Sequence, residues 1–237
     1  MAEGPSFVWV PGWSSSPAIW DGQISRLQGC RHLTVDFSSC RRPEDFPAAV
    51  LEVIGRAGTG PMLVGWSLGA MAALEAVDAG SAAVSRLLLV GSTGQFSASD
   101  AAVGWPPAAL ETMKRRLDRR PQEVLEGFHE RMFSPAEIEE GALDAWNETG
   151  RGDWAVETLK AGLDYLGGYR AYERPPPAVA VHLLHGDRDK VCPPAAAQKL
   201  SRWATAGLTV FENAGHCPWL TRPDDFHRWL SEAAGPP

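Results

Sequence analysis

The chain has 237 residues, 44% of them hydrophobic and 22% charged, which is the balance of a packed globular protein and excludes a largely disordered one. This length favours one main domain with a sizeable core. A formal net charge of -7 argues against general binding to nucleic acid or to anionic membranes, because both need a basic surface.

Short apolar runs bounded by Gly, Pro or Asp predict strands along most of the chain. They are residues 7–10, 32–37, 62–64, 86–90, 181–185 and 208–211. Helix-like segments lie at residues 43–56, 70–79, 194–204 and 223–234. Runs this short, without polar alternation, suit strands that are covered on both faces. The sequence therefore predicts an α/β protein with a mostly parallel, doubly wound sheet.

This alternation breaks between about Gly94 and Arg174, where the sequence looks helical and shows no convincing strand. The helix-like segments are residues 105–120, 121–132, 134–149 and 153–165. Three prolines follow Arg174, and proline cannot continue a helix or a central strand. We interpret residues 95–174 as a helical cap inserted into a core formed by residues 1–94 and 175–237.

The N-terminal residues lack the basic start, the longer apolar run and the cleavage site of a secretory signal. No stretch approaches the roughly 18 apolar residues that cross a bilayer, so we expect a cytoplasmic protein that does not bind membranes. The cysteines show neither CxxC pairing nor zinc-ligand spacing; they are Cys30, Cys40, Cys192 and Cys217. We interpret them as reduced thiols, and we expect a monomer with no metal and no cofactor.

The motif Gly65-Trp66-Ser67-Leu68-Gly69 has the form G-x-S-x-G and lies between a predicted strand and a predicted helix. A serine at such a sharp turn takes a strained backbone conformation, and the flanking glycines let strand and helix approach so that its hydroxyl is presented. The helix N-terminus favours negative charge developing there. We therefore predict Ser67 as a nucleophile; an ordinary glycine-rich turn is the alternative interpretation.

A serine hydroxyl needs a general base, and the base needs a group that fixes its tautomer. His216 lies on a glycine-flanked loop just after the last predicted strand, where a base is expected. Among the other five histidines only His185, which ends a predicted strand, is a serious alternative.

The orienting acid is expected after the penultimate strand, where Asp187 and Asp189 compete. We favour Asp189, because it lies beyond the tight turn that begins at Gly186 and gives the chain order Ser, Asp, His. Asp187 is then free to pair with Arg188.

A tetrahedral intermediate needs two backbone N–H donors. Leu68, the residue after the nucleophile, is expected to supply one. The loop after the first predicted strand reads Val10-Pro11-Gly12-Trp13, and the N–H of Trp13 is the candidate for the other. Trp13 and Trp66 are also candidates for lining a substrate pocket, with two ordinary core aromatics as the alternative.

Together the Pro11-Gly12-Trp13 loop, the serine motif, the Gly186 to Asp189 turn and Gly215-His216 resemble the α/β-hydrolase family over residues 5–94 and 175–234. Within that family the chain is most similar to the carboxylesterases of biotin synthesis, which demethylate pimeloyl-acyl-carrier-protein methyl ester. The resemblance implies an α/β-hydrolase fold and an oxyanion hole formed by Trp13 and Leu68.

The resemblance also implies roles for residues of the cap. The acyl chain is expected against residues 128–132, so that the expected substrate pocket comprises Trp13, Trp66, Phe128, Met132 and Trp219. Basic cap residues of those esterases hold the acidic carrier protein, and the candidates here are Arg115, Arg116, Arg119, Arg120, Arg131 and Arg151. A solvated helix face is the alternative interpretation of this basic run.

Three hypotheses about function follow. The first is a serine carboxylesterase that cleaves the methyl ester of a carrier-bound dicarboxylic acyl chain through an acyl-Ser67 intermediate. The second keeps this chemistry in a general esterase, lactonase or thioesterase that acts on small soluble acyl compounds. The third is a non-catalytic ligand receptor on the same fold.

Overall fold

The computed structural model describes residues 4–78 and 84–235. Within them six parallel strands form one sheet in the order β2-β1-β3-β4-β5-β6. The strands are β1 (Ser6–Val10), β2 (Arg31–Thr34), β3 (Met62–Trp66), β4 (Arg86–Val90), β5 (Ala180–Gly186) and β6 (Gly207–Phe211). The expected parallel α/β architecture is confirmed.

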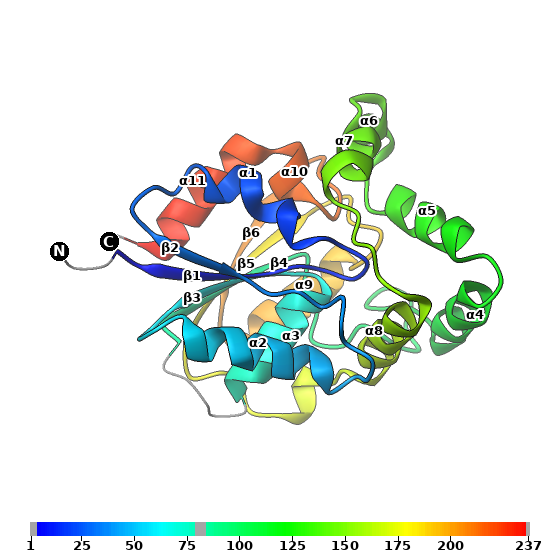
Figure 1. Ribbon diagram of the computed structural model, residues 1–237, viewed down its shortest axis with the longest axis horizontal. Coiled ribbons are helices and arrows are strands. Elements are labelled where there is room, and N and C mark those ends of the chain that lie inside the picture. Colours follow the sequence, from blue (N-terminus) through cyan, green and yellow to red (C-terminus); the bar gives the residue numbers. More distant parts are fainter. Residues whose placement is uncertain (1–3, 79–83, 236–237) are drawn as a thin grey trace.

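Helices cover both faces of this sheet (Figure 1). On one face lie α2 (Asp45–Arg56) and α3 (Leu68–Asp78), and on the other lie α1 (Asp21–Ile24) and α11 (Pro223–Ala234). The remaining core helices are η1 (Pro17–Trp20), α9 (Pro194–Ala204) and α10 (Pro218–Thr221). The sheet is therefore doubly wound, as the alternating apolar runs predict. The last residue of the helix predicted at 70–79 lies outside the described residues.

Burial follows the position of each strand in the sheet. Every residue of β3 is buried, and in β1 and β4 only the first residue is not, whereas the edge strands β2 and β6 are partly exposed. The strand predicted at residues 32–37 ends early at Thr34. Just beyond it the carboxylate of Asp36 accepts the N–H of Ser38, an Asx turn that takes the chain out of the sheet.

Helices α4 to α8 of the segment that joins β4 to β5 lie beyond the carboxyl ends of the strands (Figure 1). They are α4 (Pro107–Leu117), α5 (Pro121–Arg131), α6 (Pro135–Glu139), α7 (Ala142–Thr149) and α8 (Val156–Gly168). The short helix η2 (Ala171–Glu173) follows them and returns to the core, where Tyr172 packs against Trp203 of α9. We refer to residues 95–174 as the cap segment; its division from the core stays a prediction. The single helix predicted at residues 134–149 is wrong, because Gly141 takes φ 88° and separates α6 from α7.

The turn between β3 and α3 depends on two glycines. A Cβ on Gly69 would lie 2.2 Å from the carbonyl oxygen of Pro11, and one on Gly65 would lie 2.7 Å from Cα of Ala70. Helix α3 therefore packs directly against the loop after β1. Among the helices in residues 4–78 and 84–235, none is long and apolar enough to span a bilayer.

Replacing Gly69 by alanine tests this close approach. Because the methyl group would meet backbone atoms, we expect Gly69→Ala to lower the free energy of unfolding by about 3 kcal/mol. The matched control is Gly55→Ala in α2, where a Cβ meets nothing within 4 Å, and it should raise stability by about 0.5–1 kcal/mol. Urea unfolding measures both, and equal stabilities of the two variants would contradict the packing described.

Candidate active site

Ser67 lies at the sharp turn between β3 and α3, in the left-handed region with φ 56°. This conformation is strained for a residue with a side chain. Its N–H donates to the carbonyl of Val90 at 2.9 Å, and its own carbonyl accepts the N–H groups of Ala70 and Met71. The strained turn is thus held by β4 on one side and by the first turn of α3 on the other. The Ser67 residue is only 3% exposed.

His216 and Asp189, which follow β6 and β5, form a buried pair. The Nδ1–H of His216 donates to Oδ2 of Asp189 at 2.7 Å. The imidazole packs against Gly91, where a Cβ would lie 3.0 Å from its Cε1 atom. Gly91 is the residue after Val90, whose carbonyl accepts the N–H of Ser67. Nε2 of His216 is buried and has no hydrogen-bond partner among the described residues. The structure therefore brings the predicted base to the turn that carries the predicted nucleophile.

The carboxylate of Asp189 is fixed by its own loop. Its Oδ1 accepts the N–H groups of Val191 and Cys192, both at 2.8 Å. Burial alone would raise the pKa of Asp189, but the nearby His216, then His185 and the Cys192 N–H, outweigh it and hold this pKa below its usual value. Asp187 instead lies 3.6 Å from Arg188, so Asp189 is the aspartate that meets the histidine.

His185, the alternative base, lies on the other side of this carboxylate. Its Nε2 is 2.7 Å from the carbonyl oxygen of Cys192 and 3.3 Å from Oδ2 of Asp189. A carbonyl only accepts, so Nε2 carries the proton. Burial lowers the pKa of His185 despite the neighbouring carboxylate. Nε2 of this ring is thus engaged beside Asp189.

The side chains of the two candidate oxyanion residues meet the same residue of the cap segment. Trp13 and Leu68 both approach Gly162 of α8, where a Cβ would lie 2.6 Å and 3.5 Å from their side chains. Among the turn, loop and cap hydrogen bonds of the described residues, none uses the N–H of Trp13 or Leu68 as donor. The indole of Trp13 is anchored through its Nε1–H to the carbonyl of Leu159 at 2.9 Å. Both backbone donors are therefore available to a ligand.

The predicted pocket aromatics divide into two groups. Phe128 of α5 meets Trp13 edge-on, with ring centroids 4.8 Å apart, which puts it beside the candidate oxyanion loop. Trp66 and Trp219 instead pack together in an aromatic cluster, and the indole of Trp66 donates to the carbonyl of His216 at 2.8 Å. Trp66 thus supports the loop of the predicted base. A substrate-binding role for these residues stays a prediction.

The six basic candidates do not form one surface. Arg115, Arg116, Arg119 and Arg120 line one hollow at the end of α4. Arg131 lies elsewhere, over the ring of Trp105 at 5.2 Å, and the guanidinium of Arg151 donates to Gln122. The four arginines of the α4 end are therefore the part of the predicted docking surface that the structure brings together.

Two side chains at the site escaped the sequence analysis. His129 of α5 has its Nε2 2.9 Å from Oγ of Ser14, the residue after Trp13. Glu137 of α6 accepts the N–H of Gly215, the residue before His216. The spacing Ser134-x-x-Glu137 is the signature of a helix start, but no local pattern points to Gly215 or to Ser14. Among the described residues no group of three or more His, Cys, Asp or Glu side chains is arranged to hold a metal ion.

Comparison with known proteins finds one family over most of the chain. Residues 7–229 match the family described as the alpha/beta hydrolase family. A pimeloyl-acyl-carrier-protein methyl ester esterase of Nitrosomonas europaea is 31% identical over 236 residues, covering 94% of this chain and 93% of that protein. A protein of the same name from Vibrio vulnificus is 27% identical over 245 residues, which cover 99% of this chain and 96% of that protein. The esterase EaEST from Exiguobacterium antarcticum superposes with a TM-score of 0.83 at 23% identity, covering 97% and 91%.

The buried His129 predicts a pH dependence of stability. Burial, assisted by the charge of Arg151, lowers the pKa of His129 from 6.5 to about 3. Between these values the unfolded chain binds a proton that the folded chain excludes, so acid should destabilise the fold by up to about 1.4 kcal/mol per pH unit through this group. His129→Gln keeps a hydrogen-bonding group near Ser14 but does not titrate.

Urea unfolding at pH 7, 6, 5 and 4 measures this effect. As the pH falls, the free energy of unfolding of His129→Gln should decrease less steeply than that of the native chain. The difference in slope should approach that of one bound proton, about 1.4 kcal/mol per pH unit. Parallel slopes for the two proteins would show that His129 is not held neutral by burial.

Proposed function

Because the chain belongs to the alpha/beta hydrolase family, we propose that it is a serine carboxylesterase that works through an acyl-Ser67 intermediate. The observation that carries this proposal is the 2.7 Å bond between Nδ1 of His216 and Asp189, which leaves Nε2 as the free nitrogen of the ring. An imidazole in this tautomer is ready to accept a proton from a hydroxyl.

In the proposed acylation step the Ser67 oxygen attacks the ester carbonyl carbon while Nε2 of His216 takes the hydroxyl proton. The carbonyl oxygen becomes an oxyanion, which the N–H groups of Trp13 and Leu68 stabilise. When the intermediate collapses, the bond to the alcohol oxygen breaks and the alcohol leaves with the proton from Nε2. Asp189 stays ionised and stabilises the imidazolium that forms between these events, in keeping with its lowered pKa.

Water completes the proposed cycle. It attacks the acyl carbon of acyl-Ser67 and gives a proton to Nε2 of His216. A second oxyanion forms against the same two N–H donors. Its collapse breaks the bond to the Ser67 oxygen, which recovers the proton from Nε2, and the acyl group leaves as a carboxylic acid.

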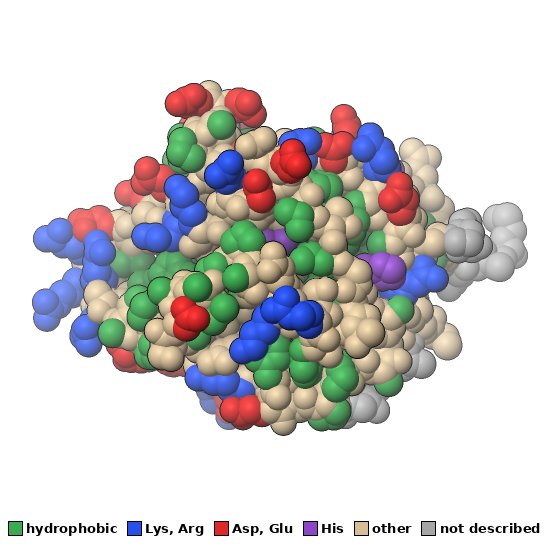
Figure 2. Space-filling model, turned by 180° about the vertical axis from the view of Figure 1, so that it is seen from behind, with side chains coloured by type: hydrophobic (Ala, Val, Ile, Leu, Met, Phe, Trp, Pro, Cys, Tyr) green, Lys and Arg blue, Asp and Glu red, His purple; other side chains and the backbone are tan. Residues whose placement is uncertain are grey.

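For the substrate we propose a methyl ester of a pimeloyl chain on acyl carrier protein, after the printed names of the relatives. Basic side chains gather at one end of the molecule, at the left edge of Figure 2, which is the end that carries α4 in Figure 1. There a hollow of about 640 Å³ is lined by Thr112, Arg115, Arg116, Asp118, Arg119, Arg120 and Glu123. Arg116 and Arg120 pair with Glu123. No ion pair among the described residues uses Arg115 or Arg119, which leaves both for an acidic partner.

A fluorophosphonate probe tests the proposed nucleophile. The probe should add one covalent adduct to the folded native chain, and peptide mapping should place it on Ser67, because only an activated serine reacts readily. Ser67→Ala should remain unlabelled. Intact mass spectrometry measures both, and an unlabelled native chain would favour a non-catalytic receptor.

A charge reversal tests the proposed carrier docking. Arg115→Glu with Arg119→Glu should reduce kcat/KM for the carrier-bound methyl ester by about 10- to 100-fold, since rim charges steer an acidic partner. Hydrolysis of a short nitrophenyl ester should change little. Methanol release and nitrophenol absorbance measure the two reactions.

Two exposed arginines on the core provide the matched control. Arg56→Glu with Arg202→Glu makes the same change of charge on α2 and α9 and should affect neither substrate. Equal losses on the two esters in the Arg115 and Arg119 variant would remove the docking hypothesis. They would favour an enzyme of small soluble esters, lactones or thioesters.

A further inference from the structure

The loop that carries His216 is attached to the cap segment through its backbone. The N–H of His216 donates to the carbonyl of Met132 at 2.7 Å. The preceding N–H, that of Gly215, donates to both carboxylate oxygens of Glu137, at 3.1 Å and 3.0 Å. A Cβ on Gly215 would lie 2.4 Å from the Met132 carbonyl oxygen, so only glycine permits this approach. Two consecutive N–H groups of this loop therefore donate to the cap segment, one to the turn between α5 and α6 and one to α6 itself.

Glu137 is itself held rigidly. Its Oε2 accepts the N–H of Ser134 at 2.7 Å while the Ser134 hydroxyl accepts the N–H of Glu137, which is a capping box at the start of α6. The residue is only 5% exposed, and no Lys or Arg in the described part of the chain forms an ion pair with it. A buried carboxylate is costly unless hydrogen bonds satisfy it, and here those bonds come from Ser134 and Gly215.

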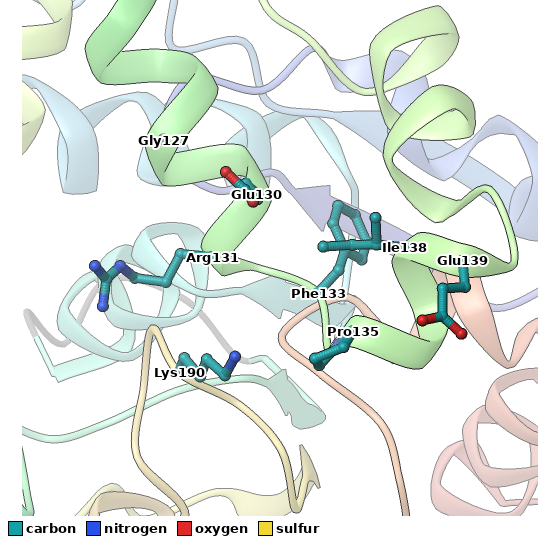
Figure 3. Close-up of a pocket in the computed structure, with 8 residues that line it drawn as sticks. All are labelled: Gly127, Glu130, Arg131, Phe133, Pro135, Ile138, Glu139 and Lys190. Carbon is teal, nitrogen blue, oxygen red and sulfur yellow. The ribbon is translucent and has the colours of Figure 1, made fainter.

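The other side of the same turn is open. A hollow of about 500 Å³ lies there. Figure 3 shows the side chains that line it, which come from α5, α6 and the loop of the predicted acid. Its lining includes Phe133 and Glu139 from the cap segment and Lys190, the residue after Asp189. Glu139 is exposed and faces this hollow, whereas Glu137, two residues earlier, is buried against Gly215. The two glutamates of α6 are thus a natural pair for comparison.

We propose that Glu137 is a positioning residue for His216, whose carboxylate fixes the Gly215 N–H and so holds the imidazole in line between Asp189 and Ser67. This inference rests on the proposed esterase function. The other side of the loop is held by the indole of Trp66, which donates to the His216 carbonyl at 2.8 Å. Glu137 does not touch the reacting atoms, and it acts through the position of the ring.

The test compares Glu137→Gln with Glu139→Gln. In the first variant an NH2 group replaces one carboxylate oxygen. Because both oxygens of Glu137 accept the Gly215 N–H, this NH2 group faces a donor whichever oxygen it replaces. For a short nitrophenyl ester we expect kcat to fall about 10- to 100-fold, the effect of a small displacement of a catalytic group, with KM within about twofold. Glu139→Gln should match the native chain. Each rate is divided by the concentration of protein that the fluorophosphonate labels, so that unfolded protein does not lower the measured kcat.

Proton NMR provides a readout that does not depend on activity. A short bond from Nδ1–H to a carboxylate gives a far-downfield resonance, which should be shifted or broadened in Glu137→Gln and unchanged in Glu139→Gln. If Glu137→Gln does not fold, Glu137→Asp, whose shorter side chain withdraws from Gly215, takes its place with the same expectations. Native kcat and a native resonance in a folded variant would overturn the positioning role. If the native chain has no esterase activity but Glu137→Gln still shifts or broadens the resonance, the proposed function is refuted and the positioning of His216 by Glu137 stands.

Discussion

The structure depends on one buried hydrogen bond, from Nδ1 of His216 to Oδ2 of Asp189. A carboxylate in the interior is stable only when its oxygens are satisfied. The loop after β5 meets this need with the N–H groups of Val191 and Cys192 on the other oxygen. Because the bond occupies Nδ1, the only nitrogen of His216 left for proton transfer is Nε2. The fold therefore sets the tautomer that the proposed mechanism needs before any substrate arrives.

The order of the strands explains how distant parts of the chain reach this bond. Strands β3, β4, β5 and β6 are neighbours and parallel, so their carboxyl ends lie along one edge of the sheet. Ser67 follows β3, Gly91 follows β4, and the loops with Asp189 and His216 follow β5 and β6. Helices of the cap segment lie beyond this edge (Figure 1), and Ser67, Asp189 and His216 are each at most 4% exposed. Electrostatic interactions are stronger at such buried positions than in water.

The sequence was informative where the chemistry is local. Ser67 lies in a turn whose glycines are its own neighbours, and the position of Asp189 follows from the strand before it, so both could be predicted from short segments. The bonds of His129 to Ser14 and of Glu137 to Gly215 join residues more than 70 positions apart, and no periodicity encodes them. The break at Gly141 escaped prediction for a related reason, since a glycine inside an apolar helical pattern is often tolerated.

We propose that Ser67 and His216, oriented by Asp189, act as one unit. Turnover of a short nitrophenyl ester by Ser67→Ala, by His216→Ala and by the double variant tests it most directly. Each single variant should lose several orders of magnitude in kcat, and the double variant should be scarcely slower than either, because removing one member already disables the other. Losses that multiply in the double variant, or a His216→Ala variant with nearly native turnover, would contradict this claim.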